Sequence, residues 1–207
     1  MNLALAGLSY AITLVALVLL AVRTKKLIGI YKKGQPDSTR GNDKAQRFKM
    51  AFGEIFGHTK MFNFSVVGLA HWFVMIGFFV LFGTLVTAYG QLIDPYFALP
   101  IIGHFWVYEY ITELIAWATG ISIVALIGIR QVTLRTNKRS RFAGSGNGKA
   151  YYVEATILLI VFCVIALRGL EGAISEYTSW NRHFITTWFI AAMFKSMTLG
   201  QLESWIQ

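Results

Sequence analysis

The chain has 207 residues, of which 56% are hydrophobic, and its apolar residues gather in blocks of roughly 20, the length that spans a bilayer. This pattern excludes an ordinary soluble domain and predicts an all-α integral membrane protein with four to five transmembrane helices. The net charge of +9 lies mainly in two loops between these blocks, so it does not indicate binding to nucleic acid.

Four apolar blocks are long enough to cross the membrane, and a fifth is shorter. The first is preceded by no basic residue and followed by Arg23, Lys25 and Lys26, so we expect a retained helix rather than a cleaved signal peptide. The fifth has only 14 residues and is expected to be either an interfacial helix or a short span. In chain order the blocks are residues 3–22, 64–89, 110–129, 151–167 and 184–197.

Two basic loops set the expected orientation. Residues 23–60 hold ten Lys and Arg against three acids, and residues 130–149 hold six against none. Residues 90–109, between the second and third blocks, hold no Lys or Arg. By the positive-inside rule both basic loops are cytoplasmic and the N-terminus is outside, which four spans satisfy. We therefore expect a multi-pass protein of the plasma membrane, surrounded by membrane lipid.

Within the first basic loop, residues 44–56 place their apolar side chains on one face of a helix. Basic side chains nearby can reach lipid phosphates, so this segment is predicted to lie on the inner membrane surface. The apolar face holds Phe48, Phe52, Ile55 and Phe56, and the basic residues are Arg47, Lys49 and Lys60.

Histidine is the residue type that most directly indicates chemistry here. His71 lies in a long apolar run, where its ring must face a protein interior, find a partner or bind a ligand such as haem iron. His58 precedes it by thirteen residues, which on one straight helix separates the two rings by roughly 20 Å and some 140°. His104 and His183 lie in the segments expected outside, where a histidine is either an interfacial polar residue or a ligand.

Charged and small residues complete the candidate set. Haem propionates or a quinone would need cations, and the acids nearest an outer quinone pocket would either exchange protons with it or pair with Arg168. Cys163 is the only cysteine, so this chain has no disulfide framework and no thiolate site for iron–sulfur or zinc; the thiol is expected to be a buried apolar filler. The candidate cations are Arg168 and Arg182 on the expected outer side and Lys60, Arg47 and Arg130 on the inner side. The candidate acids are Glu113 and Glu171. Three glycines, Gly68, Gly77 and Gly83, suit either contact with a haem ring or close helix packing.

Two stretches together resemble a known family. Residues 56–78 (FGHTKMFNFSVVGLAHWFVMIGF) and 85–95 (LVTAYGQLIDP) resemble the N-terminal membrane domain of actinobacterial heterodisulfide-reductase-like iron–sulfur oxidoreductases. That group includes the electron transfer flavoprotein:menaquinone oxidoreductases of fatty-acid β-oxidation. Its membrane part is similar to the γ subunit of respiratory nitrate reductase, a five-helix cytochrome b. The resemblance covers most of the chain and is most specific over residues 52–95.

The resemblance implies bis-histidine haem b. His58 and His71 match the two ligands on the second helix of the family, and His183 matches the outer ligand on the fifth helix, which pairs it with His71. No histidine follows His183, so the inner partner of His58 is absent from this chain and a second haem lacks one ligand.

The implied function is a membrane electron-transfer module carrying haem b. It would relay electrons between menaquinone and a cytoplasmic iron–sulfur or flavoprotein partner, fed by electron transfer flavoprotein, within a respiratory quinone-linked oxidoreductase. The family also carries a large cysteine-rich cytoplasmic domain, so these 207 residues are expected to be the N-terminal part of a longer protein or to work with a separate chain. The alternative is a cofactor-free membrane anchor that docks a soluble redox enzyme through its basic cytoplasmic loops.

Overall fold

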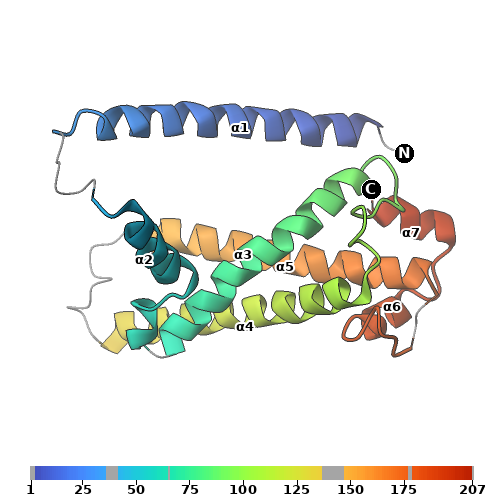
Figure 1. Cartoon of the computed structure of the whole chain (residues 1–207). Coiled ribbons are helices and arrows are strands. Elements are labelled where there is room, and N and C mark those ends of the chain that lie inside the picture. The colour runs from blue at the N-terminus through green and yellow to red at the C-terminus, as the bar shows by residue number, and fades with distance from the viewer. Residues whose placement is uncertain (1–2, 36–41, 65, 137–146, 177–178, 207) are drawn as a thin grey trace. The chain divides into compact units, whose positions relative to one another are not determined.

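The computed structural model describes residues 3–35, 42–64, 66–136, 147–176 and 179–206, which fold almost entirely as helices (Figure 1). Four of the described helices, α1, α3, α4 and α5, are long and apolar enough to cross a membrane, which confirms the predicted all-α membrane fold. The elements are α1 (Leu3–Tyr31), α2 (Lys44–Phe56), the 3-10 helix η2 (Met61–Phe64), α3 (Val66–Gln91), α4 (Trp106–Thr136), α5 (Asn147–Ile174), α6 (Trp188–Met193) and α7 (Leu199–Ile206).

The helices extend beyond the apolar blocks that predicted them. α4 begins at Trp106 rather than at residue 110, and α5 ends at Ile174 rather than at residue 167. A helix satisfies its backbone hydrogen bonds internally, so it continues through the interface after the strictly apolar stretch has ended. As a result Glu109 and Arg168 lie within helices instead of in loops.

The fifth apolar block does not form a spanning helix. Its helical part, α6, has six residues and rises about 9 Å, whereas the hydrocarbon core of a bilayer is about 30 Å thick. Of the two outcomes left open by the length of residues 184–197, the structure therefore shows a short helix and not a span.

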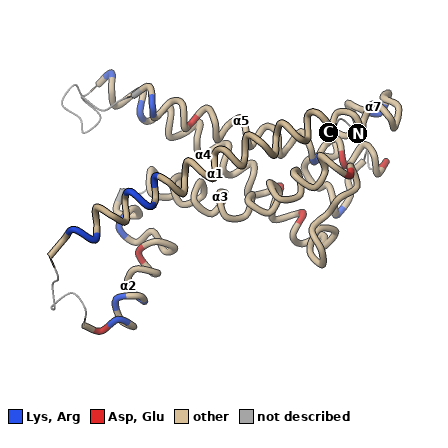
Figure 2. Tube along the Cα trace, turned by 90° about the horizontal axis from the view of Figure 1, so that it is seen from above, with Lys and Arg blue, Asp and Glu red and all other residues tan. Residues whose placement is uncertain are grey.

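The contacts within the chain divide it into two units, Met1–Thr59 and Lys60–Gln207, where the sequence predicts one membrane domain. The N-terminal unit contains α1 and α2. Lys and Arg gather on the C-terminal part of α1 and on α2 (Figure 2), and no residue of α2 is buried. The apolar side chains of α1 are exposed along almost its whole length, as suits a helix whose surroundings are lipid.

The second unit is built on three long helices. α4 packs against both α3 and α5, and α5 also packs against α6 and α7. The chain reverses direction from α3 to α4 and again to α5, so the ends of α3 and α5 and the start of α4 lie together, next to α6 and α7 (Figure 1). We call this the polar end of the bundle, because the charged side chains described below are concentrated there.

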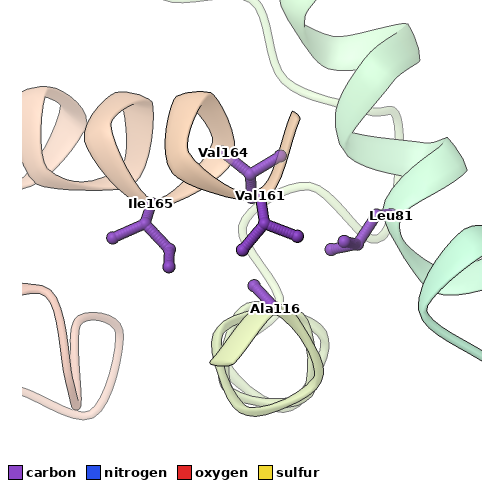
Figure 3. Packing of buried hydrophobic residues seen from close by; sticks show 5 residues of the cluster. All are labelled: Leu81, Ala116, Val161, Val164 and Ile165. Carbon is purple, nitrogen blue, oxygen red and sulfur yellow. The ribbon is translucent and has the colours of Figure 1, made fainter. Parts of the chain in front are cut away.

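A small apolar core holds the three helices together. Leu81 of α3, Ala116 of α4, and three residues of α5 point toward one another (Figure 3). Larger apolar side chains face outward, toward the expected lipid: Phe78 is 70% exposed and Phe162 is 68% exposed. The α5 members of the core are Val161, Val164 and Ile165.

The interior of the bundle also contains polar residues, most of them on α4. The buried face of α4 repeats at helical spacing and is polar along most of its length. Near its middle, α4 crosses α3 at Gly77, where a Cβ atom would overlap the side chain of Thr119. The buried polar residues of α4 are Glu109, Thr112, Glu113, Thr119 and Ser122.

Candidate functional site: a charged cavity at the polar end

Arg168 of α5 lies at the centre of the polar end. Its Nη1 donates to Oε2 of Glu171 at 2.7 Å, and its Nη2 donates to the backbone carbonyl of His183 at 2.6 Å. Oxygens of Glu109 and Glu113 lie 3.6 and 3.5 Å from the guanidinium. The Arg168 side chain is only 11% exposed, so these contacts replace most of its hydration.

Glu113 connects α4 to the segment before α6. Its Oε2 accepts hydrogen bonds from the backbone N–H of Thr186 at 2.8 Å and from the Thr186 hydroxyl at 2.7 Å. Its Oε1 accepts one from the Thr187 hydroxyl at 2.8 Å. Glu113 is only 2% exposed. Because both of its carboxylate oxygens accept hydrogen bonds, its burial is explained without a ligand.

Glu109 and His183 form a second pair beside the first. Oε2 of Glu109 lies 2.5 Å from Nδ1 of His183, whose side chain is 24% exposed. Across the bundle, Nε2 of Gln91 donates to Oε1 of Glu171 at 2.6 Å, which ties the end of α3 to α5. Three carboxylates thus lie close to one guanidinium and one histidine.

A cavity of about 530 Å³ opens beside this cluster, between α3, α5 and residues 95–104. Its walls are mainly apolar, and its polar residues come from the cluster together with His104, Tyr108 and Thr112. α3 and α5 both pack against α4 and not closely against each other. Leu85, Leu159 and Ile160 line the cavity and are also exposed on the surface of the bundle, where lipid is expected.

The structure does not bring His71 and His183 together. Gln91 bonds Glu171, Glu171 bonds Arg168 and Arg168 bonds the His183 carbonyl, so His183 lies level with the end of α3. His71 is twenty residues before Gln91 on the same continuous helix, about 30 Å along its axis. His71 is exposed and lies outside the cavity, so the two rings do not fit one haem iron.

The other predicted ligands and cations are spread over the chain. His58 is half-buried just after α2, with Nδ1 2.9 Å from the carbonyl of Ile55, and belongs to the N-terminal unit. Lys60 and Arg182 are exposed, and neither lines the cavity, so Arg168 is the one predicted propionate or quinone cation that does so among the described residues. Arg130, at the other end of α4, pairs with Glu154 at 2.6 Å.

The three candidate glycines are explained by close helix packing rather than by contact with a haem ring. A Cβ at Gly68 would overlap the backbone carbonyl of Met61 in η2, and a Cβ at Gly83 would overlap the Tyr108 hydroxyl. Gly77 meets Thr119 in the same way. The prediction of a buried thiol was wrong, because Cys163 is exposed and is one of the residues that line the cavity.

Several residues of the site were not among the sequence candidates. Tyr108 and Glu109 were missed because the charge of Glu109 made the third apolar block begin at residue 110, and Gln91 was missed because it lies at a helix end. Thr112 lies inside that block and carries no charge that would have marked it. The spacing of Glu109, Thr112 and Glu113 could have revealed one polar helix face. The described residues hold no group of three or more His, Cys, Asp or Glu side chains arranged for a metal ion.

No family model, curated protein or solved structure matches this chain. The chemistry of the cavity and its charged cluster is therefore the basis for a proposal about function.

Proposed function

We propose that this chain is the membrane module of a quinone-linked electron-transfer enzyme, and that the cavity at the polar end binds menaquinone. The observation that carries the proposal is a mainly apolar cavity, lined in part by residues exposed toward the expected lipid, whose polar wall is a cluster of ionisable groups. Ionisable side chains inside a membrane are costly, and they are typical of proton and substrate pathways. A pocket with apolar walls and a few directed polar groups suits a ring with two carbonyl oxygens.

The residues supply the protons that quinone chemistry needs. Reduction of a quinone to a quinol takes two electrons and two protons. The Glu109–His183 pair joins a buried carboxylate to a partly exposed ring, so protons can pass between the cavity and water. Arg168 places a fixed positive charge beside the cavity, which favours the negative charge that develops on a quinone oxygen during reduction.

The electrons are assigned to a cytoplasmic iron–sulfur or flavoprotein partner, in line with the resemblance of residues 52–95. In the positive-inside orientation the polar end lies at the outer face of the plasma membrane. Electrons from a cytoplasmic partner would therefore have to cross the membrane to reach this cavity, and haem b, with His71 as one candidate ligand, would carry them. If haem b is bound at His71, its second ligand is a group other than His183, so His71→Ala would remove the b-type absorbance of a reduced-minus-oxidised spectrum and His183→Ala would leave it unchanged.

A binding titration tests the proposed function. Short-chain menaquinone, added to the full chain in lipid nanodiscs, should quench tryptophan fluorescence with saturable, single-site behaviour. Ala88 of α3 lines the cavity, so Ala88→Phe should fill it and weaken binding more than about tenfold. Ile121 is 67% exposed and lies outside the cavity, so Ile121→Phe is the matched control and should bind as wild type. Non-saturable quenching in the wild type would exclude a quinone site.

The membrane anchor is the second candidate, favoured by the exposed basic residues of α1 and α2 (Figure 2). It requires a soluble partner whose binding weakens steeply with salt. Salt-dependent partner binding with no saturable quinone binding would favour the anchor over the quinone module.

A further inference from the structure

Helix α2 presents a row of apolar rings on its exposed surface. No residue of this helix is buried, and Phe48 is 72% exposed. The ring centroids of Phe48 and Phe52 lie 6.2 Å apart, and those of Phe52 and Phe56 lie 4.5 Å apart. Such a row is costly to keep in water, so an apolar medium is expected to cover this face of α2.

Two lysines lie at the borders of the apolar face. At about 100° per residue, the apolar side chains span an arc about 100° wide, with Ile55 at one edge and Phe56 at the other. Lys44 and Lys49 lie about 20° beyond the arc, on opposite sides of it. Their methylene stems can follow the apolar face while their ammonium groups reach toward phosphates. Glu54, the acid of the helix, lies about 150° from the centre of the arc, on the opposite side.

This arrangement favours a lipid surface over a protein surface as the occupant. α2 holds three basic residues and one acid, and its basic residues can be followed in Figure 2. A second copy of α2 would cover the apolar rings, but it would also bring the same positive charges to their borders. A bilayer with anionic lipids satisfies both features at once, because its acyl boundary receives the rings and its phosphates receive the lysines.

We propose that α2 lies in the cytoplasmic interface of the membrane and selects anionic lipids through Lys44 and Lys49. The apolar face supplies binding to any bilayer, and the two lysines add the preference for anionic over zwitterionic headgroups. This inference goes beyond the quinone site and does not depend on it. It also assigns Lys44 and Lys49 to lipid, which removes them from the basic surface that a membrane anchor would offer to a soluble partner.

A fluorescent label on α2 tests the position of each face. Cys163 is the only cysteine, so Cys163→Ser provides a background in which Phe52→Cys or Gly53→Cys carries a nitrobenzoxadiazole dye. Residue 52 lies near the centre of the apolar arc, whereas residue 53 lies about 110° from that centre and has open space around it. In full-chain nanodiscs of phosphatidylglycerol and phosphatidylcholine, the dye at residue 52 should shift to the blue and be quenched by spin-labelled lipid. The dye at residue 53 is the matched control and should report water.

Removal of the two lysine charges tests the lipid preference. In Lys44→Gln/Lys49→Gln, the ratio of docked to undocked dye at residue 52 should fall about fivefold for each lysine removed. The unsubstituted helix should show a comparable fall in nanodiscs of phosphatidylcholine alone. Arg182→Gln/Lys195→Gln removes two exposed cations from the second unit instead, so it is the charge-matched control and should leave the ratio unchanged.

Several outcomes would overturn the inference. A dye at residue 52 that reports water would show that the apolar face does not enter the bilayer. A dye that is shielded but not quenched by spin-labelled lipid would show that protein, from this chain or a second copy, covers the face instead. Equal docking in both lipid mixtures, or unchanged docking in Lys44→Gln/Lys49→Gln, would remove the preference for anionic lipid. None of these results bears on the menaquinone titration, so the two proposals fail separately.

Discussion

Replacement of Glu113 by Ala should destabilise the second unit strongly, because this one side chain joins α4 to the segment before α6. The substitution removes three short accepted hydrogen bonds, two from Thr186 and one from Thr187, together with a long one of 3.5 Å from Arg168, and leaves the buried Thr187 hydroxyl without its acceptor. Three bonds at the membrane average of about 0.6 kcal/mol give about 2 kcal/mol. Three bonds to a charged acceptor at about 1.5 kcal/mol give about 4.5 kcal/mol. We therefore expect a loss of about 2–5 kcal/mol in the free energy of unfolding.

The assay is reversible unfolding of the full chain in mixed micelles, followed by circular dichroism, with Glu109→Gln for comparison. Glu109 pairs with His183 and lies 3.6 Å from Arg168, so its amide replacement leaves fewer donors unsatisfied. Its loss should be the smaller of the two. If Glu113→Ala were as stable as the wild type, or if Glu109→Gln lost more stability, Glu113 would not be the main connection between α4 and the segment before α6.

Two further predictions test the packing and the electrostatics. Gly77→Ala should lower the free energy of unfolding by about 1–3 kcal/mol, because its Cβ would overlap Thr119. Gly128 has open space around it, so Gly128→Ala is the control and should cost nothing. Thermal unfolding of the two variants measures the difference. The pKa of Tyr96 is raised above its usual value of 10.0 because its hydroxyl donates to Glu203 at 2.6 Å, so this contact stabilises the fold below pH 10 and is lost as the pH rises through the folded-state pKa. Ultraviolet titration of the phenolate should show the pKa of Tyr96 returning toward its usual value in Glu203→Gln; an unchanged titration would contradict this cause.

The spanning helices could be predicted from the sequence because lipid demands long, uninterrupted apolar runs. The ends of those helices could not, since a charged residue such as Glu109 ends an apolar block without ending a helix. The fate of residues 184–197 was open for a related reason: their composition suits a membrane, but only six of them became helical. Length and hydropathy therefore identify spans well and describe the connecting segments poorly.

The candidate site was predictable in part. Arg168, Glu113 and Glu171 were identified as unusual charges near the expected outer face, and the structure places all three in one cluster. Their geometry depends on the His183 carbonyl, which reaches Arg168 from fifteen residues further along the chain and has no sequence signal of its own. The pairing of His71 with His183 was predicted from the resemblance alone. Nothing in the sequence itself indicates how far apart the two histidines lie in the folded bundle.

The distribution of polarity in α4 bears directly on function. Glu113 and Thr119 have structural explanations, because each bonds or fits a neighbouring element. Tyr108 and Thr112 lie beside them, and the Tyr108 hydroxyl packs against Gly83 of α3. Packing against α3 and the contacts of Glu113 therefore account for much of the buried polar face of α4. Glu109 and Glu113 belong in addition to the charged cluster beside the cavity, so the start of α4 is the part of this face that a quinone site would use.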